Sequence, residues 1–186
     1  LVISGIALDE INFKGETTGD EFDFDLAVSR VAFQAEDDTN GLGIDNFKTH
    51  IVSGNDSVKY EVNWDNNLQS NRNKGSVSGF VRFATLQNME AGIYSAEAEY
   101  EGNSWKIADD SRILIDTSYI NVHKFKVYKE DESFIVDGIL SDHPEDTLSV
   151  YFNKWSLKNF NPLLEGSSLS VAGIINGRFG IFRNHD

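Results

Sequence analysis

The sequence predicts an all-β protein, an antiparallel meander of short, bent strands that share one apolar face. The first observation behind this prediction is that apolar and polar residues alternate along most of the 186 residues, which is the period of a half-buried strand. The second is that no stretch keeps the i, i+3, i+4, i+7 spacing of an amphipathic helix over three turns. The third is a recurring spacing in which two alternating apolar pairs are separated by two polar residues.

The recurring spacing predicts bent strands. It is found in full at Ile6 to Phe13, Leu26 to Phe33, Ile120 to Val127 and Val150 to Leu157, and in part at Leu42 to Phe47. Successive side chains of a strand point to opposite faces, so the second apolar pair would lie on the wrong face of a flat strand. One extra residue, absorbed by a β-bulge or a sharp bend at the polar pair, returns all four apolar side chains to one face and curves the sheet. We therefore expect bulges or bends at the polar pairs, in particular at His123-Lys124 and Asn153-Lys154.

Plainer strands fill the intervals between the bent ones. We expect them at Phe22 to Leu26, Val58 to Trp64, Val77 to Phe83, Ile93 to Tyr100, Ile113 to Ile115 and Phe134 to Val136. Clusters of Asp, Asn, Gly, Ser and Pro predict turns at Asp37 to Gly41, Ser53 to Ser57, Asn71 to Gly75 and Asp142 to Asp146. One short helical turn is expected at Phe160 to Leu164.

Composition narrows the class of protein. A hydrophobic content of 40% with 12% aromatic residues is enough for a sizeable buried surface, and we interpret residues 1–186 as a single all-β segment. A formal net charge of −14 and the lack of a basic block among 16 Lys and Arg argue against a nucleic-acid partner. The lack of cysteine excludes disulfides and thiolate metal sites. Both ends of the chain read as strand, so we expect an excised segment of a longer protein.

No group of residues in the sequence indicates catalysis, and we expect no enzyme, no cofactor and no metal. The histidines are scattered, with none at metal-binding spacing from another: His50, His123, His143 and His185. Four acidic positions alternate with phenylalanines and are interpreted as the solvated face of one strand: Asp20, Glu21, Asp23 and Asp25. Glycine-rich phosphate loops are absent. The tryptophans fit core or groove positions better than an exposed sugar-binding platform: Trp64, Trp105 and Trp155.

Several segments follow one another in a specific order in the second half of the chain. They are Asn103 to Ile107, Ile113 to Val122, Phe125 to Val127, Phe134 to Leu148, Trp155 to Leu164 and Leu169 to Gly177. In order and spacing, residues 104–181 resemble the translocation and assembly module family, TamB, of the larger AsmA-like group, in the form found in Bacteroides and its relatives. The first half matches more loosely, at Tyr60 to Asp65 and Lys74 to Gly79.

The resemblance implies an interior segment of a long periplasmic protein of the bacterial cell envelope. In that family a helix anchors the N-terminus in the inner membrane, and a long, curved, taco-like β-sheet with an apolar concave face reaches toward the outer membrane. The C-terminal end engages an Omp85-type outer-membrane protein. The family is associated with phospholipid transport between the membranes and with translocation and assembly of outer-membrane proteins.

The apolar face and the resemblance together predict a groove for phospholipid acyl chains. Each buried CH₂ contributes about 0.8 kcal/mol, so a tail of about sixteen carbons gains on the order of 10 kcal/mol before ordering costs. Such contacts are nearly uniform along the groove, which favours sliding over capture. The candidate groove residues are Ile113, Ile115, Ile120, Val122, Phe125, Val127, Phe134, Val136, Leu148, Val150, Phe152, Trp155 and Leu157.

The residue pattern leaves other interpretations open. The apolar face could be the core of a closed β-sandwich that binds a carbohydrate or another surface ligand through loops at Asp37 to Gly43 or Asn66 to Lys74. A carboxylate glycosidase needs two acids facing each other at about 5 Å or about 6.5–9.5 Å, a distance that sequence does not supply. An isolated segment would also leave edge strands unpaired, which predicts a possible edge-to-edge dimer.

Overall fold

The computed structural model describes residues 2–3, 6–33, 43–66, 73–85, 87–100, 102–164 and 169–183. Within these residues, thirteen strands form one sheet, with hydrogen-bonded neighbours following chain order. The strands are β1 (Val2–Ile3), β2 (Ile6–Thr18), β3 (Glu21–Phe33), β4 (Gly43–Gly54), β5 (Ser57–Asn66), β6 (Asn73–Thr85), β7 (Asn88–Tyr100), β8 (Asn103–Ile107), β9 (Arg112–Ile115), β10 (Tyr119–Lys129), β11 (Glu132–Ser141), β12 (Leu148–Ser156) and β13 (Ile174–Ile181). A short 3₁₀ helix, η1 (Leu157–Leu164), follows β12.

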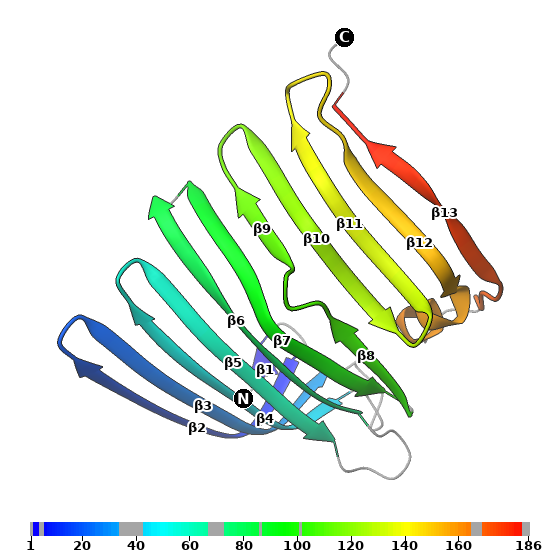
Figure 1. The fold of residues 1–186 in the computed structure, drawn as a ribbon. Coiled ribbons are helices and arrows are strands. Elements are labelled where there is room, and N and C mark those ends of the chain that lie inside the picture. The colour runs from blue at the N-terminus through cyan, green and yellow to red at the C-terminus, as the bar shows by residue number, and fades with distance from the viewer. Residues whose placement is uncertain are drawn as a thin grey trace.

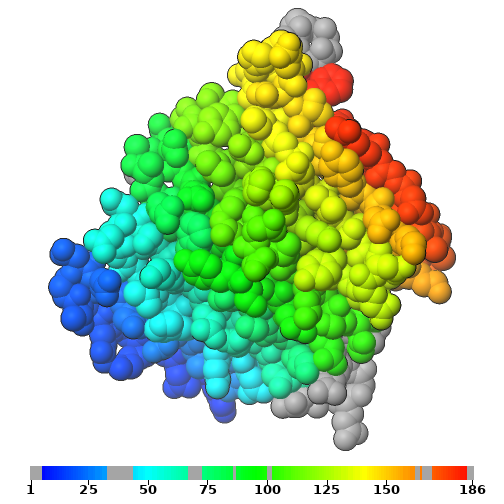
Figure 2. All heavy atoms as spheres, viewed as in Figure 1, coloured from blue at the N-terminus to red at the C-terminus, as the bar shows by residue number. Residues whose placement is uncertain are grey.

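The strands lie side by side in one curved layer (Figure 1), and every pairing between them is antiparallel. In the space-filling view the colours run in chain order from the blue edge to the red edge, and no second layer covers the face in view (Figure 2). The strands β8 and β9 share one position in the sheet, because each pairs with both β7 and β10. The expected antiparallel meander is confirmed, and the alternative of a closed two-sheet sandwich is wrong for the described strands.

The cross-strand register gives the sheet one apolar and one polar face. On one face Phe24 of β3 lies opposite Ile51 of β4, which lies opposite Tyr60 of β5. One residue along, on the other face, Asp25 lies opposite His50. Directly opposed side chains on one face are the unit by which a sheet is stabilised. The alternation that predicts the strands therefore also sorts their side chains onto two chemically different surfaces.

The polar pairs of β10 and β12 are β-bulges, as the spacing predicts. At His123-Lys124 the register between β10 and β11 shifts by one residue, and at Asn153-Lys154 the register between β12 and β13 does the same. The second residue of each pair adopts a left-handed conformation, with φ of 44° at Lys124 and 46° at Lys154. The apolar residues before and after each bulge consequently share one face.

Each bulge is capped by the side chain that faces it. The Lys124 N–H donates to Oδ1 of Asp137 on β11 at 2.9 Å. The Lys154 N–H donates to Oδ1 of Asn176 on β13 at 2.8 Å. An amide that loses its ladder partner needs another acceptor. A carboxylate or amide oxygen on the facing strand supplies one in both places.

In β2, β3 and β4 the polar pairs face one another instead of facing a single residue. Asp9-Glu10 lies opposite Ser29-Arg30, which lies opposite Asp45-Asn46, and the register continues unshifted on both sides. The second polar residues Glu10 and Asn46 adopt φ of 48° and 50°, as in the bulges. The extra residue of one strand is thus matched by an extra residue in the next. We call this line of three polar pairs the crease.

The position shared by β8 and β9 is interrupted at residues 108–111. These four residues stand opposite three on β7 and three on β10, since Ile107 and Arg112 pair with Ala96 and Gly92 on one side. Ser111, only 1% exposed, bridges the gap by donating its hydroxyl to the Lys124 carbonyl oxygen at 3.1 Å. The sequence does not predict this break, because a single serine carries no periodic signal.

Aromatic rings in the middle of the sheet lie against glycines of the neighbouring strand. A Cβ at Gly75 would overlap the indole of Trp64, and one at Gly79 would lie 2.6 Å from Oη of Tyr60. Glycine in a strand often marks such a close approach, and a ring covering it restores the lost packing. This relation was not predicted from the sequence.

Most turns agree with the sequence. Asn55-Asp56, both at positive φ, joins β4 to β5 as the Ser53–Ser57 cluster predicts, and residues 142–145 form bends and turns before β12. The turn expected at Asn71 to Gly75 is wrong in part, because β6 already begins at Asn73; residues 71–72 and 37–41 lie outside the described residues. Among the described residues, no helix has both the length and the apolar character needed to cross a membrane.

Candidate binding surfaces

The candidate groove residues lie together on one face of β9 to β12 and at the start of η1. Two rows cross three strands: Phe125 is opposite Val136 and Val136 opposite Val150 in one, and Val127, Phe134 and Phe152 form the next. The rest of the set continues these rows. Ile113 and Ile115 face Val122 and Ile120, Leu148 faces Gly138, and Trp155 faces Ile175 of β13. Leu157 begins η1, and its N–H donates to the Gly173 carbonyl oxygen at 2.9 Å.

The apolar face extends beyond the residues that the sequence singles out. On neighbouring strands the register adds Trp105, Ile107, Leu140, Phe179 and Ile181 to the same face. Their alternation was visible in the sequence, but their alignment with the candidate set depends on the bulge positions. We call the whole apolar face the trough.

An aromatic cluster forms at the β8 to β12 end of the trough. The Trp155 ring centroid lies 5.1 Å from that of Trp105, 5.8 Å from Phe134 and 6.2 Å from Phe160 of η1. Trp105 and Trp155 belong to strands that are separated by β10 and β11. Rings from non-neighbouring strands meet only where the sheet curves toward the face that carries them, so the apolar face is concave here. Trp155 is 9% exposed, and its Nε1–H has no hydrogen-bond partner in the described structure.

A polar rim borders the aromatic cluster. The Lys129 ammonium lies 4.8 Å from the Trp105 ring centroid and 3.2 Å from Oε1 of Glu132. The Glu132 carboxylate also accepts from the Ser156 N–H and the Asn159 amide, both at 3.0 Å. Burial acts to raise the pKa of Glu132, but these three donors outweigh it and hold the pKa below its usual value. Glu132 therefore fastens η1 over this end of the trough as an anion.

The rest of the trough is open to solvent. Phe13 is 77% exposed, Phe22 is 44% exposed and Phe179 is 50% exposed. Among the described strand residues on this face, only a few are buried, among them Val28, Val122 and Val150. Contiguous exposed apolar surface of this kind marks an interaction site in a soluble protein.

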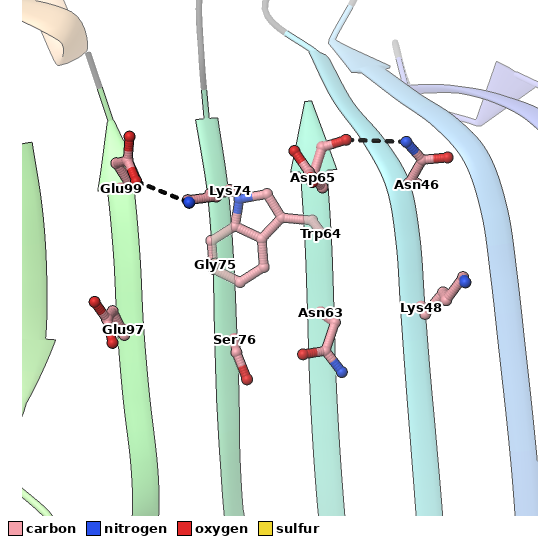
Figure 3. Close-up of a pocket in the computed structure, with 10 residues that line it drawn as sticks. All are labelled: Asn46, Lys48, Asn63, Trp64, Asp65, Lys74, Gly75, Ser76, Glu97 and Glu99. Atoms are coloured by element: carbon pink, nitrogen blue, oxygen red, sulfur yellow. Dashed lines mark hydrogen bonds and ion pairs between the residues drawn. The ribbon is translucent and has the colours of Figure 1, made fainter. Parts of the chain in front are cut away.

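The polar face carries a second hollow, shown in Figure 3, that crosses β4 to β7. It has a volume of about 510 Å³, and its walls are two rows of side chains on either side of Trp64 and Gly75. One row is Lys48, Asn63, Ser76 and Glu97, and the other is Asn46, Asp65, Lys74 and Glu99. Lys74 is paired with Glu99 at 3.0 Å, and the Asn46 amide donates to the Asp65 carbonyl oxygen at 3.0 Å. Two lysines and three carboxylates line the hollow, so its charges nearly cancel and leave little net charge to select a ligand.

Among the described residues, the remaining sequence candidates do not assemble into a catalytic arrangement; His185 lies outside the described residues. His123 is exposed on the β10 bulge, and the His143 imidazole lies in the turn before β12, where it accepts from the Glu145 N–H at 3.4 Å. The loops considered for a surface-ligand module, at 37–43 and 66–74, lie largely outside the described residues. Asp23 and Asp25 are exposed, as expected for the solvent-facing side of β3.

Comparisons with protein-family models, with curated proteins and with solved structures found no match to the chain. Fold and surfaces define its class: a single-layer antiparallel β-sheet protein with an apolar concave face and a polar opposite face. The trough is the more extensive of the two candidate surfaces, since it spans the sheet from β2 to β13.

Proposed function

We propose that the chain is a non-enzymatic segment of a TamB-like cell-envelope protein whose trough holds phospholipid acyl chains. The observation that carries the proposal is a concave apolar face that continues across the sheet with no second layer over it in the described residues. A protein core would bury such side chains, whereas here phenylalanines such as Phe13 and Phe179 remain half or more exposed.

The chemistry of the trough suits transfer rather than tight capture. Its candidate residues are aliphatic or aromatic, and hydrophobic contact with them is non-directional. Consecutive rows, such as Phe125–Val136–Val150 and Val127–Phe134–Phe152, offer a sliding tail similar surroundings at each step. A tail moving by one row exchanges one set of contacts for an equivalent one, so no position becomes a deep trap.

The sequence resemblance extends the proposal beyond this chain. From it we infer a periplasmic segment of a protein that an N-terminal helix anchors in the inner membrane and that engages an Omp85-type partner through regions outside these residues. Moving phospholipid between the membranes, or sheltering outer-membrane protein segments, are both functions that such a trough supports. The outer edge of β13 also offers a place for an edge-to-edge dimer of the isolated segment.

The proposal is tested by comparing the two faces of the same strands. A photo-crosslinking phenylalanine analogue is placed at Phe125 or Phe152 in the trough, and at the neighbouring Lys126 or Tyr151 on the opposite face. Each variant is irradiated with vesicles of phosphatidylethanolamine and phosphatidylglycerol and analysed by mass spectrometry. We expect lipid adducts at the trough positions only. Equal yields on both faces, or no adduct at either trough position, would reject the lipid trough.

A further inference from the structure

Three metal-ligating side chains meet on the polar face of β3 and β4. Asp23 and Asp25 point the same way from β3, and His50 of β4 lies directly opposite Asp25. The His50 Nδ1 lies 2.9 Å from Oδ1 of Asp25 and 3.5 Å from Oδ1 of Asp23. All three ligand atoms lie within 4.8 Å of one another. These residues lie on the opposite face of the sheet from the trough.

The separations suit a tetrahedral first-row cation. Zinc binds imidazole nitrogen and carboxylate oxygen at about 2.0–2.2 Å, which places ligand atoms of a tetrahedron about 3.3 Å apart. The two nitrogen–oxygen distances here lie on either side of that value. An imidazole with two carboxylates favours zinc over calcium, because calcium prefers six to eight oxygen ligands.

The surroundings leave room for an ion. A hollow of about 180 Å³ lies at this place, lined by the three ligand residues with Lys14 and Glu16. The Lys14 ammonium is held by Glu16 at 2.6 Å, so its charge is already countered. Glu61 on β5 lies opposite His50 and adds negative charge on the side of the histidine away from β3. Among the described residues, the ion pairs of Asp23 and Asp25 are with His50, and Lys14 lies opposite Asp25 but is paired with Glu16.

The support for the ligands is rigid. Asp25 and His50 are ladder residues within β3 and β4, in a register that runs unbroken from Phe22–Ser53 to Val28–Phe47. Ligands held on paired strands keep their spacing better than ligands on a loop. The imidazole is 25 positions from Asp25 in sequence, so only the strand register brings the group together.

We propose that Asp23, Asp25 and His50 form a zinc site, with a water molecule in the fourth position. The site crosslinks β3 to β4 on the polar face, and it stands or falls independently of the proposed lipid trough. The expectation of no metal considered Asp20, Glu21, Asp23 and Asp25 as one acidic strand, without the histidine that faces Asp25.

The test is a zinc titration of the purified chain against a chromophoric chelator at pH 7.5 and physiological salt. We expect one zinc ion per chain, with affinity reduced at least tenfold in H50A and in D25N. The matched control H123A removes another exposed histidine of the same face and should bind as the parent chain does. Cobalt substitution should give the strong visible absorption of a four-coordinate site, lost in H50A.

Two results would overturn the zinc site. One is unchanged zinc affinity in H50A whose circular dichroism matches that of the parent chain. The other is displacement of zinc by millimolar calcium in the parent chain, because that would indicate general attraction to an acidic surface. A zinc-dependent rise in melting temperature in the parent chain, absent from H50A, would support the crosslink between strands.

Discussion

The N-terminal strands β2 to β4 and the C-terminal strands β10 to β13 contain the same apolar spacing but accommodate it differently. In β2 to β4 the polar pairs face one another, so the register is preserved across the crease. In β10 and β12 each polar pair faces one residue, Asp137 or Asn176, so the register shifts and the facing side chain caps the bulge. The effect of a polar pair therefore depends on the neighbouring strand. Where the neighbour also carries a polar pair, several strands bend along one line and keep their register; where it does not, the register between the two strands shifts by one residue.

The two regions also differ in how their aromatic residues pack. At the C-terminal end, rings from β8, β11 and η1 pack around the buried Trp155. In the middle and N-terminal strands, rings such as Trp64 and Tyr60 lie singly against glycines. We therefore expect the C-terminal region to carry more of the stability, and the N-terminal region to carry more exposed trough.

The largest expected effect is that of W155A. Removing a buried indole with ring neighbours leaves a cavity and should reduce the free energy of unfolding by about 3–5 kcal/mol. The control W64A removes a half-buried indole and should cost roughly 1–2 kcal/mol. Urea unfolding followed by circular dichroism measures both. Equal losses for the two variants would break the comparison between a packed end and an open region.

A smaller effect is expected for G79A. Its Cβ would overlap the Gly92 carbonyl oxygen and lie 2.6 Å from Oη of Tyr60, and backbone cannot yield as a flexible side chain can, so we expect a loss of about 1–3 kcal/mol. The control G177A on β13 meets no atom within 4 Å and should be neutral or more stable by about 0.4–1 kcal/mol. Thermal melts of the two variants give the comparison. A G79A chain as stable as G177A would show that the ring-on-glycine packing is not tight.

Removing a bulge cap should lower the stability by less than either substitution above. D137A removes the acceptor of the Lys124 N–H, and an unmet backbone amide costs about 1 kcal/mol. In the crease, E10A removes only an exposed hydrogen bond from the Ser29 hydroxyl and should cost less than about 0.5 kcal/mol. Chemical unfolding measures the loss of stability in both variants. Hydrogen exchange at the Lys124 amide should be faster in D137A only, which would sharpen the distinction between the capped bulges and the crease. Equal costs would contradict it.

The smallest expected effect concerns the protonation of His50, on the crease strand β4. The hydrogen bond that the His50 imidazole donates to Asp25 raises the pKa of His50; burial opposes this, and the Asp23, Asp25 and Glu61 charges add to it. Since the pKa is raised in the folded chain, this pair stabilises fully below the unfolded value of about 6.5, and the contribution is lost as pH rises through the folded value. An NMR titration should give a lower His50 pKa in D25N and no change in D116N. An unchanged pKa in D25N would contradict the pairing.

Much of the fold could be predicted because strand periodicity and the polar pairs are local signals. Bulges could be predicted at His123-Lys124 and Asn153-Lys154, because without an extra residue the apolar side chains before and after each pair would lie on opposite faces. The matching of Asp9-Glu10 with Ser29-Arg30 could not be predicted, because it depends on which residues face each other after the turn. The break at Ser111 was not predicted, because a side chain that replaces a ladder hydrogen bond leaves no periodic signal in the sequence. The start of β6 at Asn73 was not predicted, because it lies within a cluster of residues that is typical of a turn.

The candidate surfaces were predictable only in part. The apolar residues of β9 to β12 could be assigned to one face from alternation. Their meeting with Trp105 and Phe160 required the curvature of the sheet, and the approach of His50 to Asp23 and Asp25 required the register between β3 and β4. Contacts between residues distant in sequence are set by pairing, and pairing is what a single sequence specifies least directly.

The crease has a mechanical consequence. Along it the ladder skips the pairs through Glu10, Ser29 and Asn46, while the bonds on both sides remain aligned. A sheet with one aligned row of missing bonds has its lowest bending stiffness along that row. We therefore expect β2 to β4 to bend along the crease with little loss of hydrogen bonding. A line of polar residues on the outer face would then govern how easily the trough changes width at that end.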